Sequence, residues 1–330
     1  MAPINKMYDF LVIGGGSGGV ASARRASKYG KKVAVIEGGR LGGTCVNVGC
    51  VPKKIMWSTA DTADRIRESR DYGFATPADV AFNWAEVKHK RDEYVRKLNG
   101  IYEKNLLNES VEYIPGWAKF VSPSEVEVDH LDGSGKRLYS AQHILIAVGG
   151  TPTVPIGEGY EHGITSDGFF ELSAQPKRVA LVGAGYIAIE FAGIFNALGS
   201  QTHLFIRHDK FLRTFDPMIQ DVIMDNYEKR GIMIHKNSKT IKKVEKMSSG
   251  QLKIHFEDSN GPNVLEVDTL MWAVGRTPEV KRLEISKANV DLSDDGYIKV
   301  DEFQNTSSEN IHALGDVCGE YQLTPGKYFH

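Results

Sequence analysis

The hydrophobic pattern of the chain begins with a short apolar run at residues 8–13, which is followed by a glycine-rich turn. A stretch of helical periodicity then continues to about Tyr29, and a second apolar run follows at residues 32–37. The same order returns later, with apolar runs at residues 178–182 and 202–206 on either side of a glycine-rich turn and an amphipathic helix that extends toward Gly199. Short apolar runs separated by helices predict βαβ units with parallel strands. We therefore predict an α/β fold with two Rossmann-like domains.

The first glycine turn, residues 14–19, has the pattern G-x-G-x-x-G. In such a turn Gly14 permits the tight bend, Gly16 lets the backbone approach a pyrophosphate, and Gly19 allows close packing of helix and strand. Glu37 ends the next strand and is placed to accept hydrogen bonds from a ribose. A simple surface turn would explain the glycines, but not the strand, helix and acid together, so we predict a dinucleotide site.

The second glycine turn, residues 183–188, reads Gly-Ala-Gly-Tyr-Ile-Ala. The strand that follows ends in Arg207 and His208, with Arg213 a few residues beyond. The planar guanidinium of arginine suits a ribose 2′-phosphate, whereas an acid would repel it. We interpret the second dinucleotide as NADP rather than NAD; the alternative is that these are ordinary solvated charges at a strand end. Two such sites indicate that one dinucleotide passes electrons to another.

Two cysteines, Cys45 and Cys50, lie between these turns in a segment of glycines, a proline and lysines at residues 42–54. Their C-x4-C spacing allows a disulfide if the backbone is somewhat distorted. A zinc site usually needs four ligands, and no second cysteine or histidine pair accompanies them, so we predict no metal. Inert thiols remain the alternative, but the lysines and glycines indicate a shaped, electropositive site that favours the reactive thiolate.

Composition excludes several other classes of function. The 330 residues include 40 basic and 42 acidic side chains, and the formal net charge of −2 favours neither nucleic acid nor an anionic membrane as a partner. The N-terminus leads almost directly into the first strand, and no apolar stretch approaches the roughly 20 residues of a membrane span. With 3 cysteines, the chain fits a reducing compartment. We expect a soluble cytoplasmic protein, with a mitochondrial form from another start as the alternative.

Residues 42–54, GGTCVNVGCVPKK, together with the paired glycine turns resemble the flavin disulfide oxidoreductases, which are FAD-dependent pyridine nucleotide-disulfide oxidoreductases. Residues 146–152 and 273–278 resemble the segments that join the FAD and NADPH domains of this family, and residues 313–317 resemble its second flavin motif. The resemblance covers nearly the whole chain and implies domains of the three-layer ββα type. It predicts an FAD-binding domain at residues 1–150, an NADPH-binding domain at 151–278, and an incomplete return to the FAD or central domain at 279–330.

The resemblance implies FAD and NADPH as cofactors and a redox-active cysteine pair. Hydride from NADPH would reduce the flavin, Cys50 would accept the electrons and open its disulfide with Cys45, and Cys45 would attack the substrate. Lys53 and Glu190 match an ion pair beside the flavin. The cofactor-binding residues it implies are Gly14, Gly16, Ser17, Gly18, Gly19, Glu37, Thr44, Asp316, Thr324, Gly183, Gly185, Tyr186, Ile187, Glu190, Arg207, His208, Arg213, Gly275 and Arg276.

Residues outside the shared motifs are similar to the glutathione reductase branch of this family. In that branch the residues that match Ser17, Arg24 and Tyr102 contact the tripeptide, and Arg24 would pair with a glutathione carboxylate. The basic run at residues 206–213 is likewise similar to its 2′-phosphate site. Glutathione disulfide is therefore the expected substrate, and a thioredoxin or dihydrolipoamide type of reductase is the alternative.

The chain also departs from the family pattern. The family's general acid is a histidine followed by proline, from the C-terminal interface domain of the partner subunit, and none of the 10 histidines here precedes a proline. We expect that a C-terminal dimerisation domain of about a hundred residues is absent. The homodimer of full-length members is then in doubt, turnover should be severely impaired, and the alternative is a flavoprotein that binds FAD and NADPH without turnover.

Overall fold

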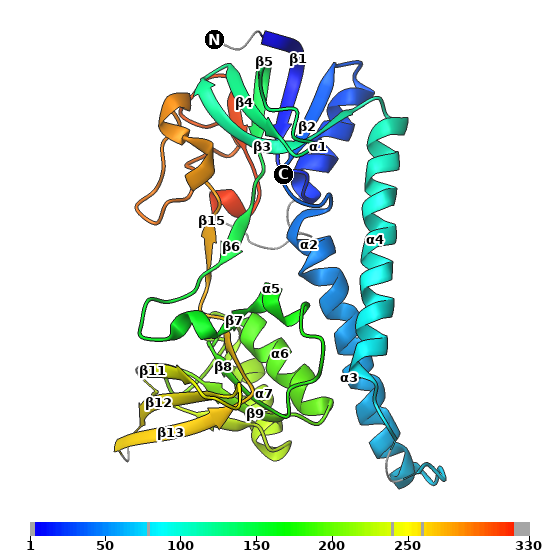
Figure 1. Cartoon of the computed structure of the whole chain (residues 1–330), viewed down its shortest axis with the longest axis vertical. Helices are drawn as coiled ribbons and strands as arrows, with labels where there is room; N and C mark the ends of the chain where they lie inside the picture. Colours follow the sequence, from blue (N-terminus) through cyan, green and yellow to red (C-terminus); the bar gives the residue numbers. More distant parts are fainter. Residues whose placement is uncertain (1–3, 78–79, 239–240, 259–260, 320–330) are drawn as a thin grey trace. The chain divides into compact units, whose positions relative to one another are not determined.

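A computed structural model describes residues 4–77, 80–238, 241–258 and 261–319. The chain forms two compact units, and it passes between them several times. The first unit contains Met1–Val51, Glu93–Thr151 and Thr277–His330, and the second contains Pro52–Asp92 and Pro152–Arg276. Both units combine helices with a sheet of parallel strands (Figure 1), which confirms the predicted α/β fold class.

A sheet of six strands organises the first unit. Its parallel part consists of neighbouring strands β3, β2, β1, β5 and β16, and the long strands β3 and β5 also pair with β4 in an antiparallel meander. The strands are β1 (Ile4–Ile13), β2 (Val33–Glu37), β3 (Glu112–Ser122), β4 (Glu125–His130), β5 (Lys136–Ile146) and β16 (Ile311–Ala313). Because parallel strands have both faces covered, β2 is an almost continuous buried run rather than an alternating one.

The first helices of this unit follow the carboxyl ends of strands β1 and β2. Helix α1 (Ser17–Lys28) connects β1 to β2 and buries Gly19, Val20 and Ala23 against them. The short helix α2 (Gly43–Asn47) follows β2, and α3 (Cys50–Glu68) and α4 (Trp84–Asn108) each begin or end in this unit. The 3-10 turns η3 (Lys281–Leu283), η4 (Ile285–Ala288) and η5 (Asp316–Cys318) bring the late residues Leu283, Ile285 and Val317 into the core of this unit.

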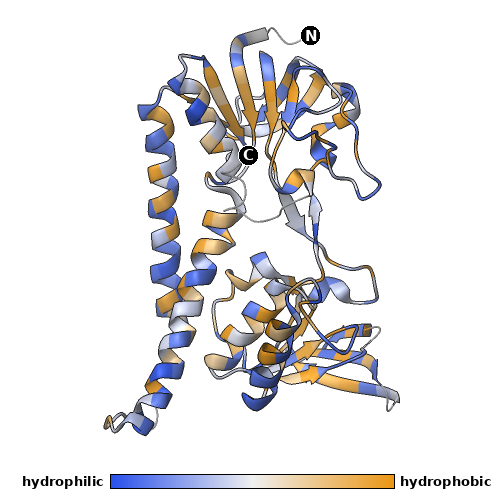
Figure 2. Ribbon diagram, turned by 180° about the vertical axis from the view of Figure 1, so that it is seen from behind, coloured by the Kyte–Doolittle hydropathy of each residue, from blue (hydrophilic) through white to orange (hydrophobic). Residues whose placement is uncertain are grey.

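A five-stranded parallel sheet with the order β10, β9, β8, β14, β7 organises the second unit. These strands are β7 (Ile164–Thr165), β8 (Arg178–Val182), β9 (Gln201–Phe205), β10 (Met233–His235) and β14 (Thr269–Trp272). A three-stranded antiparallel sheet adds β11 (Ile241–Lys246), β12 (Leu252–Asp258) and β13 (Gly261–Val267). Strands β6 (Gly150–Pro152) and β15 (Arg276–Pro278) pair with each other where the chain passes between units. Apolar residues concentrate on the strands of both sheets (Figure 2).

The helices of the second unit are α5 (Ser166–Phe169), α6 (Tyr186–Ala197) and α7 (Pro217–Lys229), with the 3-10 turns η1 (Ser69–Tyr72) and η2 (Tyr160–His162). Seven of the twelve residues of α6 are buried, and the polar residues Glu190 and Asn196 are only partly exposed. Aromatic side chains pack against the buried residues, since Trp84 stacks on Phe195 with ring centroids 6.3 Å apart and Phe169 lies 4.4 Å from Phe191.

Candidate functional site

The first glycine turn has no room for side chains at Gly14 and Gly19, whereas a Cβ on Gly16 would meet only the Cα of Gly43 at 3.7 Å. A Cβ atom on Gly14, whose φ is 109°, would lie 2.3 Å from the carbonyl oxygen of Ala147, and one on Gly19 would lie 2.0 Å from the oxygen of Gly14. A Cβ on Gly18 would meet Leu314 at 2.2 Å. The strand, the turn and helix α1 therefore approach one another as closely as the predicted dinucleotide site requires.

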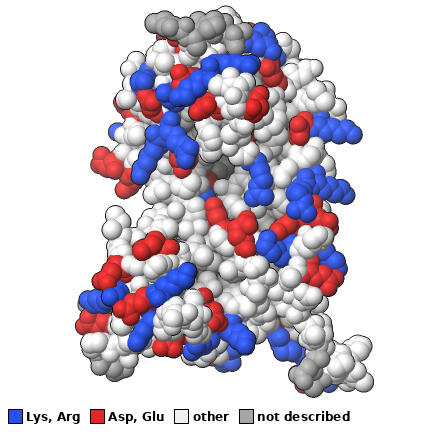
Figure 3. All heavy atoms as spheres, in the orientation of Figure 1, with Lys and Arg blue, Asp and Glu red and all other residues white. Residues whose placement is uncertain are grey.

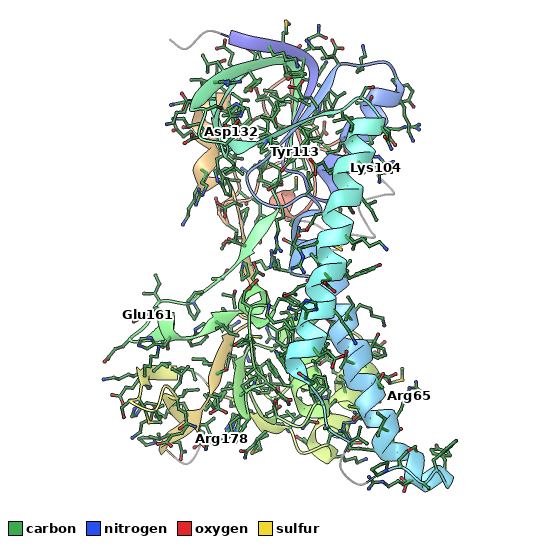
Figure 4. All side chains as sticks on the ribbon, turned by 45° about the vertical axis from the view of Figure 1, so that its right-hand side comes forward. Arg65, Lys104, Tyr113, Asp132, Glu161 and Arg178 are labelled. Atoms are coloured by element: carbon green, nitrogen blue, oxygen red, sulfur yellow. The ribbon has the colours of Figure 1, made fainter. Side chains whose placement is uncertain are left out.

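Glu37, at the end of β2, binds the first turn directly. Its carboxylate accepts hydrogen bonds from the backbone N–H groups of Gly15 and Gly39, each at 2.6 Å. Tyr113, labelled in Figure 4, lies on the neighbouring strand β3; burial raises its pKa, and the charges of Glu37 and Glu103 raise it further. A carboxylate fixed in this way beside the turn is available to a ribose hydroxyl, as the sequence predicts.

The second glycine turn repeats this geometry in the other unit. Gly183 has φ of 151°, and a Cβ there would lie 2.2 Å from the carbonyl oxygen of Ala273. Ala188 takes the third position of the motif and is fully buried. No Cβ clash arises at Gly185, which caps helix α6 just as Gly16 caps α1.

Both helices thus begin at a glycine, which has no side chain to accept hydrogen bonds from the first-turn N–H groups. Neither first turn contains an acidic residue. The N-terminus of a helix carries a partial positive charge and unpaired donors, so it binds anions such as phosphate. The glycine turns and helix ends therefore fit the diphosphates of FAD and NADPH.

The basic side chains predicted for the 2′-phosphate follow β9. Arg207, His208 and Arg213 are all exposed. The loop that carries them is anchored to the second glycine turn, because the N–H of Leu212 donates to the oxygen of Ala184 at 2.8 Å. Leu212 is buried although its φ of 54° is left-handed, so the loop is folded back toward the turn at some conformational cost.

The two cysteines lie on either side of a tight connection between α2 and α3. Cys45 is half-buried in α2, and Cys50, the first residue of α3, is exposed. A Cβ on Gly49 would lie 2.8 Å from the oxygen of Thr44 and 3.3 Å from the Cα of Cys45. Glycine is thus needed for the chain to return to Cys45, which is consistent with a functional pair.

The start of α3 favours negative charge at Cys50. The helix has 19 residues, and its first turn contains no acidic residue. A helix N-terminus stabilises a thiolate, which is the nucleophilic form of cysteine.

A pair of asparagines that sequence reasoning missed holds the cysteine segment in place. The Asn47 amide is buried, and its Nδ2 donates to the backbone oxygens of Arg40, Leu41 and Gly43 at 3.2, 3.1 and 2.9 Å. Asn99 of α4 donates to Asn47 Oδ1 at 2.9 Å and to the oxygen of Leu41 at 2.7 Å. The sequence shows an asparagine between the two cysteines, but no neighbouring residue indicates that its partner lies in α4.

Lys53 and Glu190, which are far apart in sequence, form an ion pair in the second unit. Lys53 Nζ of α3 lies 2.9 Å from Glu190 Oε1 of α6, and both side chains are partly exposed. Further contacts hold α3 beside α6, since Arg67 Nη2 donates to the oxygen of Ala197 at 2.6 Å. The contact exists as the resemblance implies, while its role beside a flavin stays a prediction.

The predicted substrate residues lie on α1 and α4 of the first unit. Ser17 begins α1, and Arg24 lies two turns later on the same face. A hydrogen bond to Glu109 raises the pKa of Arg24, and the nearby Tyr102 of α4 raises it further. The guanidinium of Arg24 is therefore already paired with a carboxylate, which the sequence analysis did not anticipate.

The remaining predicted residues lie near these elements. Strand β16 pairs with β5, and Asp316 follows it in η5, a few residues after Leu314, whose side chain contacts the first glycine turn. Gly275 has φ of 140°, and its carbonyl oxygen accepts a hydrogen bond from the N–H of Thr153 at 2.9 Å. Burial raises the pKa of Asp167, and the charge of Arg276 opposes this rise. Tyr186 and Ile187 form the start of α6. Thr324 lies outside the described residues.

Basic and acidic side chains are intermixed on the face that Figure 3 shows. Within the described ranges, no group of three or more histidine, cysteine or acidic side chains could hold a metal ion. Across the same residues, the helices lack the combined length and apolar character that crossing a bilayer requires.

Comparisons with known proteins agree with this geometry. Residues 8–327 match the family described as pyridine nucleotide-disulphide oxidoreductase. The chain is 56% identical over 327 residues to a glutathione reductase from Schizosaccharomyces pombe, which covers 98% of this chain and 70% of that protein. It is 51% identical over 326 residues to a glutathione reductase from Yarrowia lipolytica, with 96% and 69% covered.

A solved structure is also similar. This is the copper(II) complex of the HOCl-induced flavoprotein disulfide reductase RclA from Escherichia coli, with a TM-score of 0.86 and 27% identity over 98% of this chain and 69% of that one. The sequence resemblance is thereby confirmed. The chain belongs to the pyridine nucleotide-disulphide oxidoreductase family.

Proposed function

We propose that this chain is an NADPH-dependent glutathione-disulfide reductase that uses FAD and the Cys45–Cys50 pair. The observation that carries the proposal is the cysteine segment itself, in which Gly49 brings the backbone of Cys50 back to Cys45 directly after the first glycine turn. The glutathione reductases to which the chain is about half identical support the choice of substrate.

The two glycine turns hold the two dinucleotides in this proposal. FAD binds at the first turn, with Glu37 on its ribose and Asp316 on its ribityl chain, within an FAD-binding domain made mostly of residues 1–150. NADPH binds at the second turn, with Arg207 and Arg213 on its 2′-phosphate, within residues 151–278. When bound, FAD supplies two-electron transfer between NADPH and the cysteine pair.

The cysteines carry out the exchange with substrate. The Cys45 thiolate attacks one sulfur of glutathione disulfide, the substrate S–S bond breaks, and one glutathione leaves as thiolate and takes up a proton. The Cys50 thiolate then attacks the Cys45 sulfur, which forms the Cys45–Cys50 disulfide and releases the second glutathione. The pair is oxidised by two electrons and the substrate is reduced by two. Gly49 and Asn47 keep the two sulfurs within reach, and the start of α3 stabilises Cys50 as a thiolate.

The proposal extends to partners and location. Ser17, Arg24 and Tyr102 contact glutathione, and Lys53 with Glu190 lies beside the flavin ring. We place the protein in the cytoplasm, which the small number of cysteines favours. Full-length relatives would be homodimers, and this chain spans about 70% of the length of the curated relatives.

The test is NADPH oxidation by the purified 330-residue chain. The visible flavin spectrum is recorded first, and the rate is then measured with and without glutathione disulfide. Turnover that depends on glutathione disulfide supports the proposal. Turnover with lipoamide or thioredoxin alone would reassign the substrate, and a yellow protein without any turnover would indicate a flavoprotein that only binds its cofactors.

A further inference from the structure

The guanidinium of Arg24 is engaged at two points by a carboxylate of the same unit. Arg24 Nε lies 3.0 Å from Glu109 Oε2, and Arg24 Nη2 lies 2.5 Å from Glu109 Oε1. This is the bidentate geometry in which arginine binds carboxylates most strongly. A carboxylate of any ligand that approaches Arg24 therefore meets a position that Glu109 already holds.

The backbone fixes Glu109 in this position. Glu109 directly follows the end of α4, its N–H donates to the oxygen of Asn105 at 3.1 Å, and the hydroxyl of Ser27 in α1 donates to its carbonyl oxygen. The next residue, Ser110, has φ of 55° and forms the left-handed turn that ends the helix. Two hydrogen bonds and the end of helix α4 thus fix the backbone of Glu109 beside α1.

The Arg24–Glu109 ion pair is exposed enough for a ligand carboxylate to replace Glu109. The side chains of Arg24 and Glu109 keep 36% and 22% of their surface exposed, so another carboxylate can reach the guanidinium without unfolding the turn. The Arg24 hydrogen bond lowers the pKa of Glu109, and Lys28 adds to this, so the carboxylate is ionised at neutral pH. Ion pairs with this degree of exposure contribute little free energy, which makes replacement by a ligand carboxylate feasible.

We propose that Glu109 is a specificity-determining residue that competes with the carboxylate of glutathione disulfide for Arg24. This inference rests on the proposed function, which places Arg24 at a glutathione carboxylate. A disulfide with a suitably placed carboxylate displaces Glu109, whereas a disulfide without one leaves the internal pair intact and gains nothing from Arg24. Glu109 thereby lowers the affinity for disulfides that carry the carboxylate and leaves the affinity for uncharged disulfides unchanged, so it determines how strongly the site prefers the first class over the second.

The experiment is equilibrium binding measured by calorimetry on the full chain loaded with FAD, without NADPH. All proteins carry Cys45→Ser and Cys50→Ser, so that no thiol exchange occurs. The decisive variant is Glu109→Gln, which keeps the size of the side chain and removes its charge. The matched control is Glu103→Gln, which makes the same charge change on the exposed side of α4. The ligands are glutathione disulfide and its tetraethyl ester, in which all four carboxylates are blocked.

We expect Glu109→Gln to bind glutathione disulfide about two- to fivefold more tightly than the parent, which is the range that a partly exposed ion pair supports. Glu103→Gln should bind it like the parent, and the tetraethyl ester should bind equally to all three proteins. Adding Arg24→Met should abolish the gain from Glu109→Gln, because the two side chains would then no longer be coupled.

The remaining outcomes separate the inference from the function on which it rests. If the parent binds glutathione disulfide and Glu109→Gln binds it equally or more weakly, the inference is wrong and the proposed function stands. A gain that is the same for the tetraethyl ester, or that survives Arg24→Met, also overturns the inference. If no variant binds glutathione disulfide, the proposed function fails and the inference fails with it.

Discussion

Replacing Asn47 by alanine should loosen the cysteine segment. The Asn47 amide has two N–H donors for the oxygens of Arg40, Leu41 and Gly43, and it accepts one hydrogen bond from Asn99, so about three hydrogen bonds are lost. At about 1 kcal/mol each, the free energy of local opening should fall by about 3 kcal/mol, or roughly a hundredfold in the opening equilibrium.

Native-state hydrogen exchange measures this opening. The amides to follow are those of Gly42 and Val48, which donate to Gly15 and Thr44 at 2.8 and 2.9 Å. Asn47→Asp gives a sharper test, because it keeps the acceptor for Asn99 but directs a carboxylate at backbone oxygens, so it should loosen the segment more than alanine does.

Two results would refute this reasoning. One is unchanged protection at Gly42 and Val48 in Asn47→Ala. The other is Asn47→Asp behaving like the parent. Thr62→Ala is a suitable control, because its hydroxyl makes a single exposed bond to the oxygen of Ser58, and it should leave exchange in the cysteine segment unchanged.

Three further predictions concern the chemistry and the second unit. Cys45→Ser should reduce glutathione-disulfide-dependent NADPH oxidation below about 1% of the parent rate, and full activity would overturn its role as nucleophile. Arg207→Gln with Arg213→Gln should reduce the preference for NADPH over NADH at least about tenfold in kcat/KM, and an unchanged preference would mean that the phosphate is held elsewhere. Burial lowers the pKa of His203 to about 4, with His235 and Arg178 adding to it, so the unfolded chain takes up the proton first as the pH falls. Stability should therefore fall from about pH 6.5 toward pH 4 by at most about 1.4 kcal/mol per unit, and His203→Phe should flatten this slope in thermal unfolding.

The glycine turns could be predicted from sequence because their physics is local. Gly14 and Gly183 have φ angles that favour glycine and meet the carbonyl oxygens of Ala147 and Ala273, and the sequence shows both glycines between an apolar run and a helix. A motif of this kind requires a strand, a turn and a helix in one order, so the residues themselves determine the backbone. The basic loop could be predicted for the same reason, since Arg207 lies two residues after the end of the second strand of its βαβ unit.

Contacts between distant residues could not be predicted in the same way. The Lys53–Glu190 ion pair was expected only through the family resemblance, because no pattern links a residue of α3 to one of α6. Asn47 and Asn99 are 52 residues apart in sequence and form a part-buried hydrogen bond between two helices, and a single asparagine has no periodicity that reveals its partner. Polar partners of this kind become visible only when the packing of the helices is known.

Arg24 illustrates how such a partner changes the interpretation of a motif residue. The sequence alone predicts that Arg24 is an unpaired cation that binds a substrate carboxylate, so the affinity of the site for substrate would follow from that contact alone. In the structure its hydrogen bonds are made by Glu109, so binding becomes an exchange of one carboxylate for another. The net free energy is then the difference between two similar ion pairs, which is smaller than either and depends on a residue outside the motif. Under this proposal, the affinity for substrate would be set jointly by the motif on α1 and by the end of α4.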